Sequence, residues 1–268
     1  MSAAQPLAAA DAEPVLLRQD EGGVATLTLN RPGARNALSL GLMGALLDAL
    51  GAIRSDDSVR VVVLKAAGPA FCAGHDLREM RANPSPEATE HLFRTCARLM
   101  TGLVHLPKPV IAQVQGIATA AGCQLVASCD LAVCEEGARF ATPGVQIGLF
   151  CSTPMVALSR AVPRKAAMEM LLLGEPVDAA EALRLGLVNR VVPAAGLEAA
   201  VAEFARRIAA KPRRVVAVGK EAFSRQIEMT LEDAYAYTAG VMTKNMAMAD
   251  AQEGIDAFLQ KRTPVWEG

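Results

Sequence analysis

The chain has 268 residues, a formal net charge of -1 and 52% hydrophobic residues. This length and apolar content are typical of one large globular domain, or of a domain with an appendage. Lysine and arginine are scattered rather than gathered in a basic block, which argues against nucleic-acid binding. The longest apolar runs end well short of the roughly 20 residues that a membrane helix needs, so we expect no membrane partner.

The first residues carry no recognisable targeting signal. Residues 1–14, MSAAQPLAAADAEP, contain no basic residue and no sustained apolar segment. They therefore match neither a secretory signal nor an arginine-rich transit peptide. We expect a short mobile tail and a cytoplasmic protein.

Six cysteines lie among apolar neighbours, without a CxxC pair and without a histidine at metal-ligand spacing. Cysteines of this kind behave as small buried hydrophobic residues in a reducing compartment, so we expect no metal site. They are Cys72, Cys96, Cys123, Cys129, Cys134 and Cys151.

Strands alternate with helices in the first half of the chain. The segment 24–29, VATLTL, alternates in character and predicts a strand. Ser39 can cap the helix that follows the loop NRPGARNA. The expected apolar stripe of that helix is Leu40, Met43, Leu47 and Leu50. A continuous β-branched run at 60–65, RVVVLK, predicts a strand covered on both faces.

The same rhythm continues to about residue 150. A helical pattern carries Leu92, Cys96, Leu99 and Leu103 on one face. Buried strands are predicted at 110–114, VIAQV, and at 130–134, DLAVC, with a short helix between them. Neither GxGxxG nor GxxxxGK[ST] occurs, so the chain has no fingerprint of a nucleotide-binding loop.

From about Thr153 onward the signals are mostly helical, with proline or glycine at the joints. The stretch 230–248 repeats alanine, methionine and tyrosine at helical spacings. Its apolar content exceeds what a solvent-facing helix needs, which predicts burial against another subunit. Packing on the chain's own core is the alternative that the sequence leaves open.

Two glycine-containing loops are the candidates for chemistry. In FCAGHDL, Gly74 permits a tight turn that leaves the amide of His75 free. In ATAAGCQL, the amides of Ala120, Ala121 and Gly122 are unpaired donors of a first helical turn, where negative charge is favoured. Small residues at such joints often serve close packing alone. Two convergent amides make an oxyanion hole, and the pair of loops around a buried strand favours that function.

Several segments resemble, in order, the signatures of the enoyl-CoA hydratase/isomerase (crotonase) superfamily. They are NRPGARNAL, AFCAGHDLREM, VQGIATAAGCQLVASCDLAV, FATPGVQIGL, RAVPRKAAMEMLLLGEPVDAAEALRLGLVNRVV and EGIDAFLQKRTPVW. The match covers nearly the whole chain after residue 15. Within the superfamily, GHDL, GLFCSTP and FLQKRTPVW are most similar to the enoyl-CoA hydratase domain-containing protein 3 group.

The resemblance implies an α/β fold with a crotonase-like ββα spiral core at 15–192 and a C-terminal helical trimerisation region at 193–268, after the tail at 1–14. It implies a homotrimer or a dimer of trimers. It also implies an acyl-CoA thioester as the ligand, lyase-type chemistry of fatty acid metabolism, and no cofactor beyond the coenzyme A of the substrate itself.

Site residues follow from the resemblance by position. The oxyanion donors are the backbone amides of His75 and Ala121. For Arg35 and Lys261 the alternative is an ordinary solvated surface charge. Phe258 and Lys261 match positions that often reach the CoA bound by a neighbouring subunit. Residues at CoA-binding positions are Ala34, Arg35, Ala37, Ala73, Asp76, Leu77, Phe258 and Lys261.

The chain departs from the hydratase pattern at the catalytic carboxylates. Hydratases of this superfamily use two glutamates to move the proton of water, and those positions here are Gln124 and Gly144. An amide does not accept a proton near neutral pH and glycine has no side chain. The sequence therefore predicts that the polarising half of the machinery is present and that the proton-transfer half is missing.

Other side chains near the expected thioester are weak substitutes. Ser152 falls near the position of the catalytic carboxylate in a dehalogenase branch of the superfamily, but no base is evident beside it. His75 is the one group there whose ordinary pKa is near neutrality, although its side chain is expected to point away from the reacting carbon. Asp76 is expected to fix its loop by accepting backbone hydrogen bonds.

Two functions remain open on this reasoning. One is an enzyme whose reaction needs only thioester polarisation, or whose base comes from the substrate or an unexpected residue. The other is a non-catalytic protein that binds or senses acyl-CoA without turnover.

Overall fold

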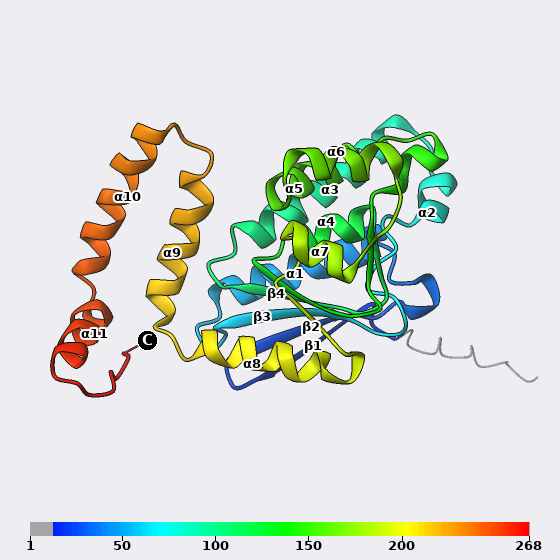
Figure 1. Ribbon diagram of the computed structural model, residues 1–268. Helices are drawn as coiled ribbons and strands as arrows, with labels where there is room; N and C mark the ends of the chain where they lie inside the picture. The colour runs from blue at the N-terminus through cyan, green and yellow to red at the C-terminus, as the bar shows by residue number, and fades with distance from the viewer. Residues whose placement is uncertain (1–12, 268) are drawn as a thin grey trace, which may run out of the picture.

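The protein is built on one sheet with helices on both faces, followed by a helical arm (Figure 1). The computed structural model describes residues 13–267, so most of the tail predicted at 1–14 lies outside the described residues. The six strands of the main sheet lie in the order β1-β2-β3-β4-β6-β9. The β1–β2 pair is antiparallel and the other pairs are parallel. A smaller sheet has the order β5-β7-β8.

The strands are β1 (Leu16–Glu21), β2 (Val24–Leu29), β3 (Val61–Ala66), β4 (Val110–Val114), β5 (Ile117–Thr119), β6 (Leu131–Glu135), β7 (Arg139–Ala141), β8 (Val177–Asp178) and β9 (Arg190–Val192). The α-helices are α1 (Leu40–Ser55), α2 (Leu77–Ala82), α3 (Pro86–Val104), α4 (Ala121–Ala127), α5 (Pro154–Ala161), α6 (Arg164–Leu173), α7 (Ala179–Leu185), α8 (Leu197–Ala209), α9 (Arg213–Gln226), α10 (Leu231–Met246) and α11 (Ala249–Leu259). Short 3₁₀ turns are η1 (Pro32–Ala34), η2 (Pro143–Ile147) and η3 (Ala194–Gly196).

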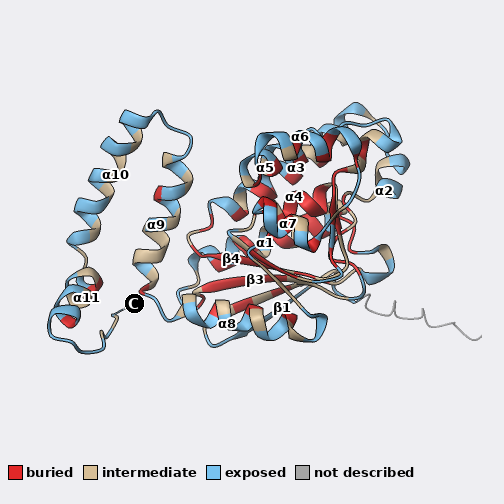
Figure 2. Cartoon of the chain, viewed as in Figure 1, coloured by how far each residue is buried: buried red, intermediate tan, exposed pale blue. Residues whose placement is uncertain are grey.

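The central strand β3 is buried on both faces, as its continuous β-branched run predicts. Val62 and Leu64 belong to the main core together with α1, α3 and α4. Val61 and Val63 belong to a second cluster, formed with α8 on the opposite face. Two helical layers therefore hold the sheet between them, and α4 lies in the main core (Figure 2).

The helix α1 begins where the sequence predicts, because the Ser39 side chain accepts a hydrogen bond from the Leu42 amide. Its buried face differs from the predicted stripe. Leu40 and Leu47 are only half-buried at the edge of the core. The buried residues are Leu42, Met43, Leu46, Leu50 and Ile53. Compared with the predicted stripe, the buried face is rotated about the helix axis by about one residue position.

The part after Thr153 is mostly helical, as predicted, but two short strands that the sequence did not predict, β8 and β9, also lie there. β9 adds to the edge of the main sheet beside β6. β8 pairs with β7 in the small sheet. Strands of two and three residues carry too few side chains to show an alternating pattern.

The helices α9, α10 and α11 form an arm that stands beside the core (Figure 1). No residue of α10 is buried, and its surface is apolar at Tyr235, which is 70% exposed, and at Met242, which is 58% exposed. Figure 2 shows the same helix in the colours of exposed and half-buried residues. The apolar side chains of α10, within the segment 230–248, are therefore not buried by the chain itself.

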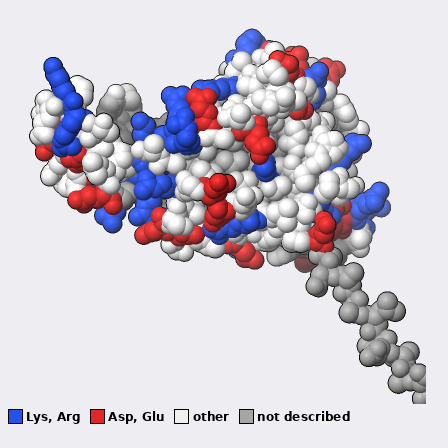
Figure 3. All heavy atoms as spheres, turned by 90° about the horizontal axis from the view of Figure 1, so that it is seen from below, with Lys and Arg blue, Asp and Glu red and all other residues white. Residues whose placement is uncertain are grey.

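Surface charge, helix hydropathy and the state of the cysteines complete the description of the fold. Acidic and basic side chains are interspersed on the face that α8 covers (Figure 3). Among the described helices, none is long and apolar enough to cross a bilayer. Five cysteines are buried and Cys129 is half-buried, and all six are free thiols.

Candidate functional site

Three loop segments meet at the predicted oxyanion site and are joined by backbone hydrogen bonds. The Leu38 amide donates to the Gly74 carbonyl at 2.7 Å, and the Asp76 amide donates to the Leu38 carbonyl at 3.1 Å. On the other side, the Thr119 amide donates to the Cys72 carbonyl at 2.9 Å. The 72–76 segment is therefore held between 35–38 and 117–121, so both predicted glycine loops lie side by side.

Glycine is required at both loops by their close approach. Gly74 has φ +91°, and a Cβ atom there would lie 2.9 Å from the Cβ of Ala120. A Cβ atom on Gly122 would lie 2.2 Å from the carbonyl oxygen of Cys72. Any side chain at either position would separate the two loops.

The two predicted oxyanion donors are free. Within residues 13–267, the amides of His75 and Ala121 donate no hydrogen bond to a protein group. Ala121 is the first residue of α4, whose N-terminal amides have no partner in their own helix. Ala120 precedes it with φ +50°, a conformation that costs of order 1–3 kcal/mol for a non-glycine residue. Unpaired amides beside a strained residue are typical of a site that binds an anion or an oxyanion.

The His75 ring is turned into the core rather than toward solvent. It packs edge-on against Phe93 of α3, with 5.4 Å between ring centroids. Both ring nitrogens are buried and make no hydrogen bond. Burial lowers the pKa of His75 to about 4. The nearby Leu38 backbone favours the charged ring and opposes this shift, but it makes no hydrogen bond with either ring nitrogen. The imidazole is therefore neutral near neutral pH.

Asp76 fixes its loop, as expected. Its Oδ1 accepts hydrogen bonds from the amides of Arg78 and Glu79, which caps α2. Its Oδ2 lies 2.9 Å from the Arg31 guanidinium. The hydrogen bond with Arg31 is the main reason that the pKa of Asp76 is lowered. Arg31 also donates to the Ala37 carbonyl, so it ties the predicted CoA loop to the start of α2.

Gln124 lies inside the site and not on its surface. It is 4% exposed, in the middle of α4. The Cys96 thiol of α3 donates to its Oε1 at 3.8 Å. The amide therefore occupies the interface between α3 and α4, where the sequence motif places a hydratase glutamate.

The second carboxylate position is closed by the chain itself. A Cβ atom on Gly144 would lie 2.8 Å from the Leu149 carbonyl oxygen and 2.9 Å from the Cys151 sulfur. The Gly144 amide donates to that sulfur at 3.3 Å. Burial raises the pKa of Cys151, so the thiol stays protonated at neutral pH. Cys151 thus fills the space that a side chain at position 144 would need.

Comparison with known proteins decides the family. A model described as enoyl-CoA hydratase/isomerase matches residues 19–268. The chain belongs to the enoyl-CoA hydratase/isomerase family. It is 50% identical over 253 residues to the enoyl-CoA hydratase domain-containing protein 3, mitochondrial, of Xenopus laevis, which covers 94% of this chain and 86% of that protein.

Solved structures of the hydratase/isomerase family confirm the crotonase fold. A crystal structure of enoyl-CoA hydratase from Mycobacterium smegmatis matches with a TM-score of 0.94 and 57% identity, over 96% of this chain and 100% of that one. The human enoyl-CoA hydratase domain-containing protein 3 matches with a TM-score of 0.91 and 46% identity, over 94% of this chain and 100% of that one. The predicted likeness to this group is confirmed as well.

The expectation of a cytoplasmic protein is contradicted by these relatives. The Xenopus, mouse and human members of the domain-containing protein 3 group are all named mitochondrial. The expectation rested on the composition of residues 1–14, most of which lie outside the described residues. The composition of so short a stretch does not identify a compartment.

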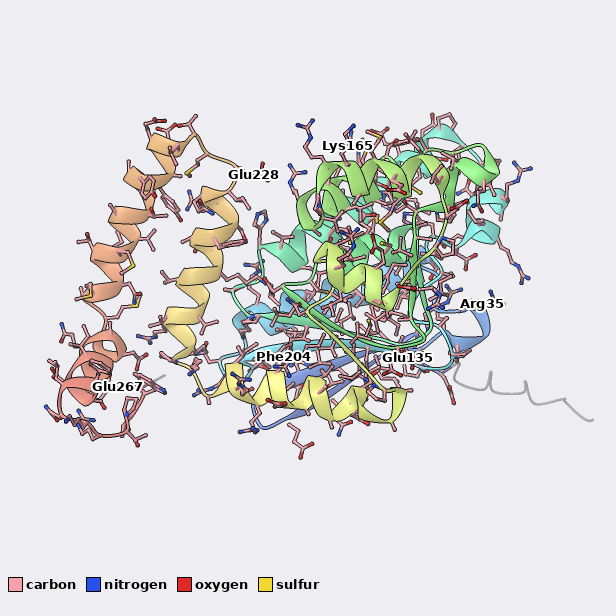
Figure 4. The ribbon with its side chains drawn as sticks, in the orientation of Figure 1. Arg35, Glu135, Lys165, Phe204, Glu228 and Glu267 are labelled. Atoms are coloured by element: carbon pink, nitrogen blue, oxygen red, sulfur yellow. The ribbon has the colours of Figure 1, made fainter. Side chains whose placement is uncertain are left out.

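The structure brings part of the predicted hydratase/isomerase site together and leaves two residues far away. Arg35 is exposed on its loop at one end of the molecule, whereas the arm that ends near Glu267 stands at the other (Figure 4). Phe258 and Lys261 belong to that arm, and Phe258 is 82% exposed. Within one chain, therefore, these two residues do not meet the CoA loop.

Four further predicted residues lie in or next in sequence to the loop segments around the oxyanion site. Ala34 and Ala73 are half-buried, Ala37 is buried, and Leu77 is exposed at the start of α2. Ser152 is exposed and its hydroxyl donates to the Phe150 carbonyl at 3.3 Å. Its hydroxyl is therefore not paired with any base in the described residues.

The position of Cys151 beside Gly144 and the buried contacts of Lys220 are not predicted from the sequence. A thiol seven residues after Gly144 is a possible neighbour in a short loop, so Cys151 could have been proposed from spacing. The contacts of Lys220 join distant parts of the chain, so no local sequence pattern predicts them. Across residues 13–267, no group of three or more metal-ligating side chains is positioned to hold a metal ion.

Proposed function

We propose that this protein binds acyl-CoA thioesters and polarises the thioester carbonyl between the amides of His75 and Ala121. The observation that carries this proposal is the pair of free amides on loops that two glycines hold in close approach. Amides fixed in this way stabilise developing negative charge without reorganising, and one such donor is worth roughly 10²–10³ in rate.

Efficient hydration is not part of the proposal. A placed acid or base contributes roughly 10²–10⁴ in rate, and both positions lack a carboxylate here. Position 144 also has no room for one, because the Leu149 carbonyl and Cys151 occupy that space. The hydratase activity in the names of the relatives is a property of those proteins, and we expect only trace hydration from this chain.

A non-catalytic role in acyl-CoA binding or sensing is the second candidate. It is favoured by the protonation states around the loops. His75 has inaccessible ring nitrogens and Cys151 is a protonated thiol. Asp76 is occupied by Arg31 and by two backbone amides. None of these groups is placed as an available base, so a reaction here would need its base from the substrate.

We further propose that the CoA site is completed by a second copy of the chain in a homotrimer or a dimer of trimers. Arg35 lies beside the oxyanion loop, because the Ala73 amide donates to its carbonyl at 3.0 Å. The arm that carries Phe258 and Lys261 ends near Glu267, at the other end of the molecule from Arg35 (Figure 4). The apolar surface of α10 has no partner within the chain. Closed symmetric association would bury that surface and bring one copy's arm to its neighbour's loops.

Two measurements on the same ligands test the function. Calorimetry with acetyl-CoA, longer acyl-CoAs, free CoA and NAD should show binding of the CoA compounds and much weaker binding of NAD. Steady-state turnover of the same acyl-CoAs then separates the two candidates, since a sensor binds without turnover. Equal binding of acetyl-CoA and NAD would refute the acyl-CoA site.

A further inference from the structure

A lysine of the arm enters the core and uses all three of its donors there. The side chain of Lys220, on α9, is 8% exposed. Its ammonium donates to the carbonyl oxygens of Leu103 and Lys108, both at 3.0 Å, and to Asp130 Oδ2 at 2.6 Å. An ammonium has three N–H donors, so the group is fully satisfied by this set.

Each of these acceptors anchors a different element. Leu103 is in the last turn of α3, and Lys108 lies in the loop that leads to β4. Asp130 follows α4 after the turn of Ser128 and Cys129. Asp130 also brackets the start of β4, because its Oδ2 accepts from the Val110 amide at 2.7 Å and its own amide donates to the Val110 carbonyl.

The two helices held by this ammonium are the ones that frame the candidate site. α3 and α4 meet at the contact between the Cys96 thiol and Gln124 Oε1. α4 has only 7 residues, so it spans about 10 Å from the Asp130 end to the Ala121 amide. A shift at its C-terminal end therefore moves its N-terminal amide, because a packed helix of two turns moves as a unit.

The other attachments of α9 to the core are thin. Ala222 is the one buried residue of α9. Two open pockets, of about 420 and 270 Å³, lie beside the helix, the first lined by His105 and the second by Phe223. Arg213 pairs with an exposed Asp57, and Arg160 pairs with an exposed Glu228. Lys220 thus makes the buried polar contact of α9 with the core, whereas the ion pairs of Arg213 and Glu228 lie on the surface.

We propose that Lys220 is a positioning residue, which through Asp130 and the end of α3 sets the place of α4 and so of the Ala121 amide and Gln124. The arm that is proposed to reach a neighbour's CoA is thereby coupled to the oxyanion amides of its own chain. The inference rests on the proposed function. Two links support it: Lys220 is hydrogen-bonded to Asp130, which the backbone of Ser128 and Cys129 joins to the end of α4, and it is hydrogen-bonded to Leu103 of α3, whose Cys96 contacts Gln124.

The test uses a ligand that reports polarisation separately from binding. Cinnamoyl-CoA absorbs at longer wavelength when its conjugated carbonyl is polarised, whereas free CoA reports only binding. Lys220→Met removes the donors but leaves the Asp130 carboxylate partly buried and unpaired, which threatens folding. The Lys220→Met/Asp130→Asn double variant removes both charges and is measured beside it. Arg213→Ala is the matched control, since it breaks another link between arm and core without touching α4.

Wild type and Arg213→Ala should bind free CoA and shift the cinnamoyl-CoA absorption to the red. The two Lys220 variants, or the double variant alone if the single one does not fold, should bind free CoA as wild type does and lose most of the shift. A full red shift in a folded Lys220 variant would overturn the positioning role. An equal loss in Arg213→Ala would overturn it too, because arm attachment in general would then be the cause. Wild type that binds without any shift would instead refute the proposed function.

Discussion

A Cβ atom on Gly74 would stand 3.5 Å from the backbone nitrogen of Ala121. The two loops therefore lie close together, so that the amide of His75, which follows Gly74, and the amide of Ala121, the first of α4, belong to adjacent stretches of backbone. The same Cβ atom would also lie 3.1 Å from the Thr119 carbonyl oxygen. The absence of a side chain at position 74 is therefore a condition for the two loops to meet.

Gly74→Ala should destabilise the protein more than Gly186→Ala. Gly186 has a similar φ, +85°, but its Cβ would meet nothing closer than 3.7 Å. A side chain in the left-handed region costs about 1–2 kcal/mol at either position. Overpacking against Ala120 adds about 1–3 kcal/mol at position 74 alone. Urea unfolding measures both variants, and equal losses would mean that the loops separate without cost.

Gln124→Glu should raise the hydration of crotonyl-CoA above a trace level in the wild type. The gain should reach about 10²-fold at most, the lower end for a placed acid or base, because no supporting shell holds the new carboxylate. Loss of enoyl absorbance measures the rate. Gln252→Glu on the exposed face of α11 is the control and should change nothing. Substantial turnover by the wild type would contradict the expected loss of hydration and would mean that another residue supplies the base.

Sequence alone favours restoring both glutamates, but the structure limits that design. Gly144→Glu would push a Cβ atom against the backbone of Leu149 as well as against Cys151. Removing the thiol does not free this space, since the carbonyl oxygen stays. We therefore expect Gln124→Glu/Gly144→Glu to be less stable than Gln124→Glu, with no further gain in hydration.

His75 should make stability depend on pH. Its pKa falls from 6.5 to about 4 on folding, so the unfolded chain binds more protons between these values. The contribution of the neutral ring to the free energy of unfolding is fully present above about pH 6.5. It is lost as the pH falls, by about 2 kcal/mol between about pH 7.5 and pH 5. Urea unfolding at the two pH values measures this loss. His75→Phe should remove it and exposed His91→Gln should keep it. A loss that persists in His75→Phe would assign it to another group.

The α10 surface should hold the assembly together. Tyr235 and Met242 lie seven residues apart, on one face of the helix, and both are exposed in the single chain. Tyr235→Glu/Met242→Glu should therefore dissociate a trimer that light scattering detects in the wild type at micromolar concentration. Lys244→Glu, on the opposite face, should leave the mass unchanged. A wild-type monomer at that concentration would contradict the proposed assembly.

The long buried strands of the fold could be predicted from sequence. The expected segments 24–29 and 110–114 coincide with β2 and β4, because β-branched and alternating runs report burial directly. The polar edge strand β1 shows only one half-buried residue, so its pattern resembles a loop. Short strands such as β8 exist because a neighbouring strand offers hydrogen bonds, which is a tertiary cause.

The candidate site was predictable only where local chemistry specifies it. Glycine at a tight turn and the first amides of a helix point to Gly74 and to the amides of residues 120–122, whereas the choice of Ala121 among them came from the family resemblance. The contact of Lys220 with Asp130 joins residues 90 positions apart, so it depends on the assembled fold. The same is true of the space at Gly144, which is closed by the backbone of a later loop.

The difference absorption spectrum of bound cinnamoyl-CoA is a direct measurement of the oxyanion hole, because it reports the polarisation of the carbonyl and not the binding of CoA. We expect a shift to longer wavelength with the wild type and the loss of that shift in a Gly74→Ala variant that still folds and binds CoA. Gly186→Ala should keep the shift. A wild-type protein that binds cinnamoyl-CoA without moving its absorption would contradict the claim that His75 and Ala121 form an oxyanion hole.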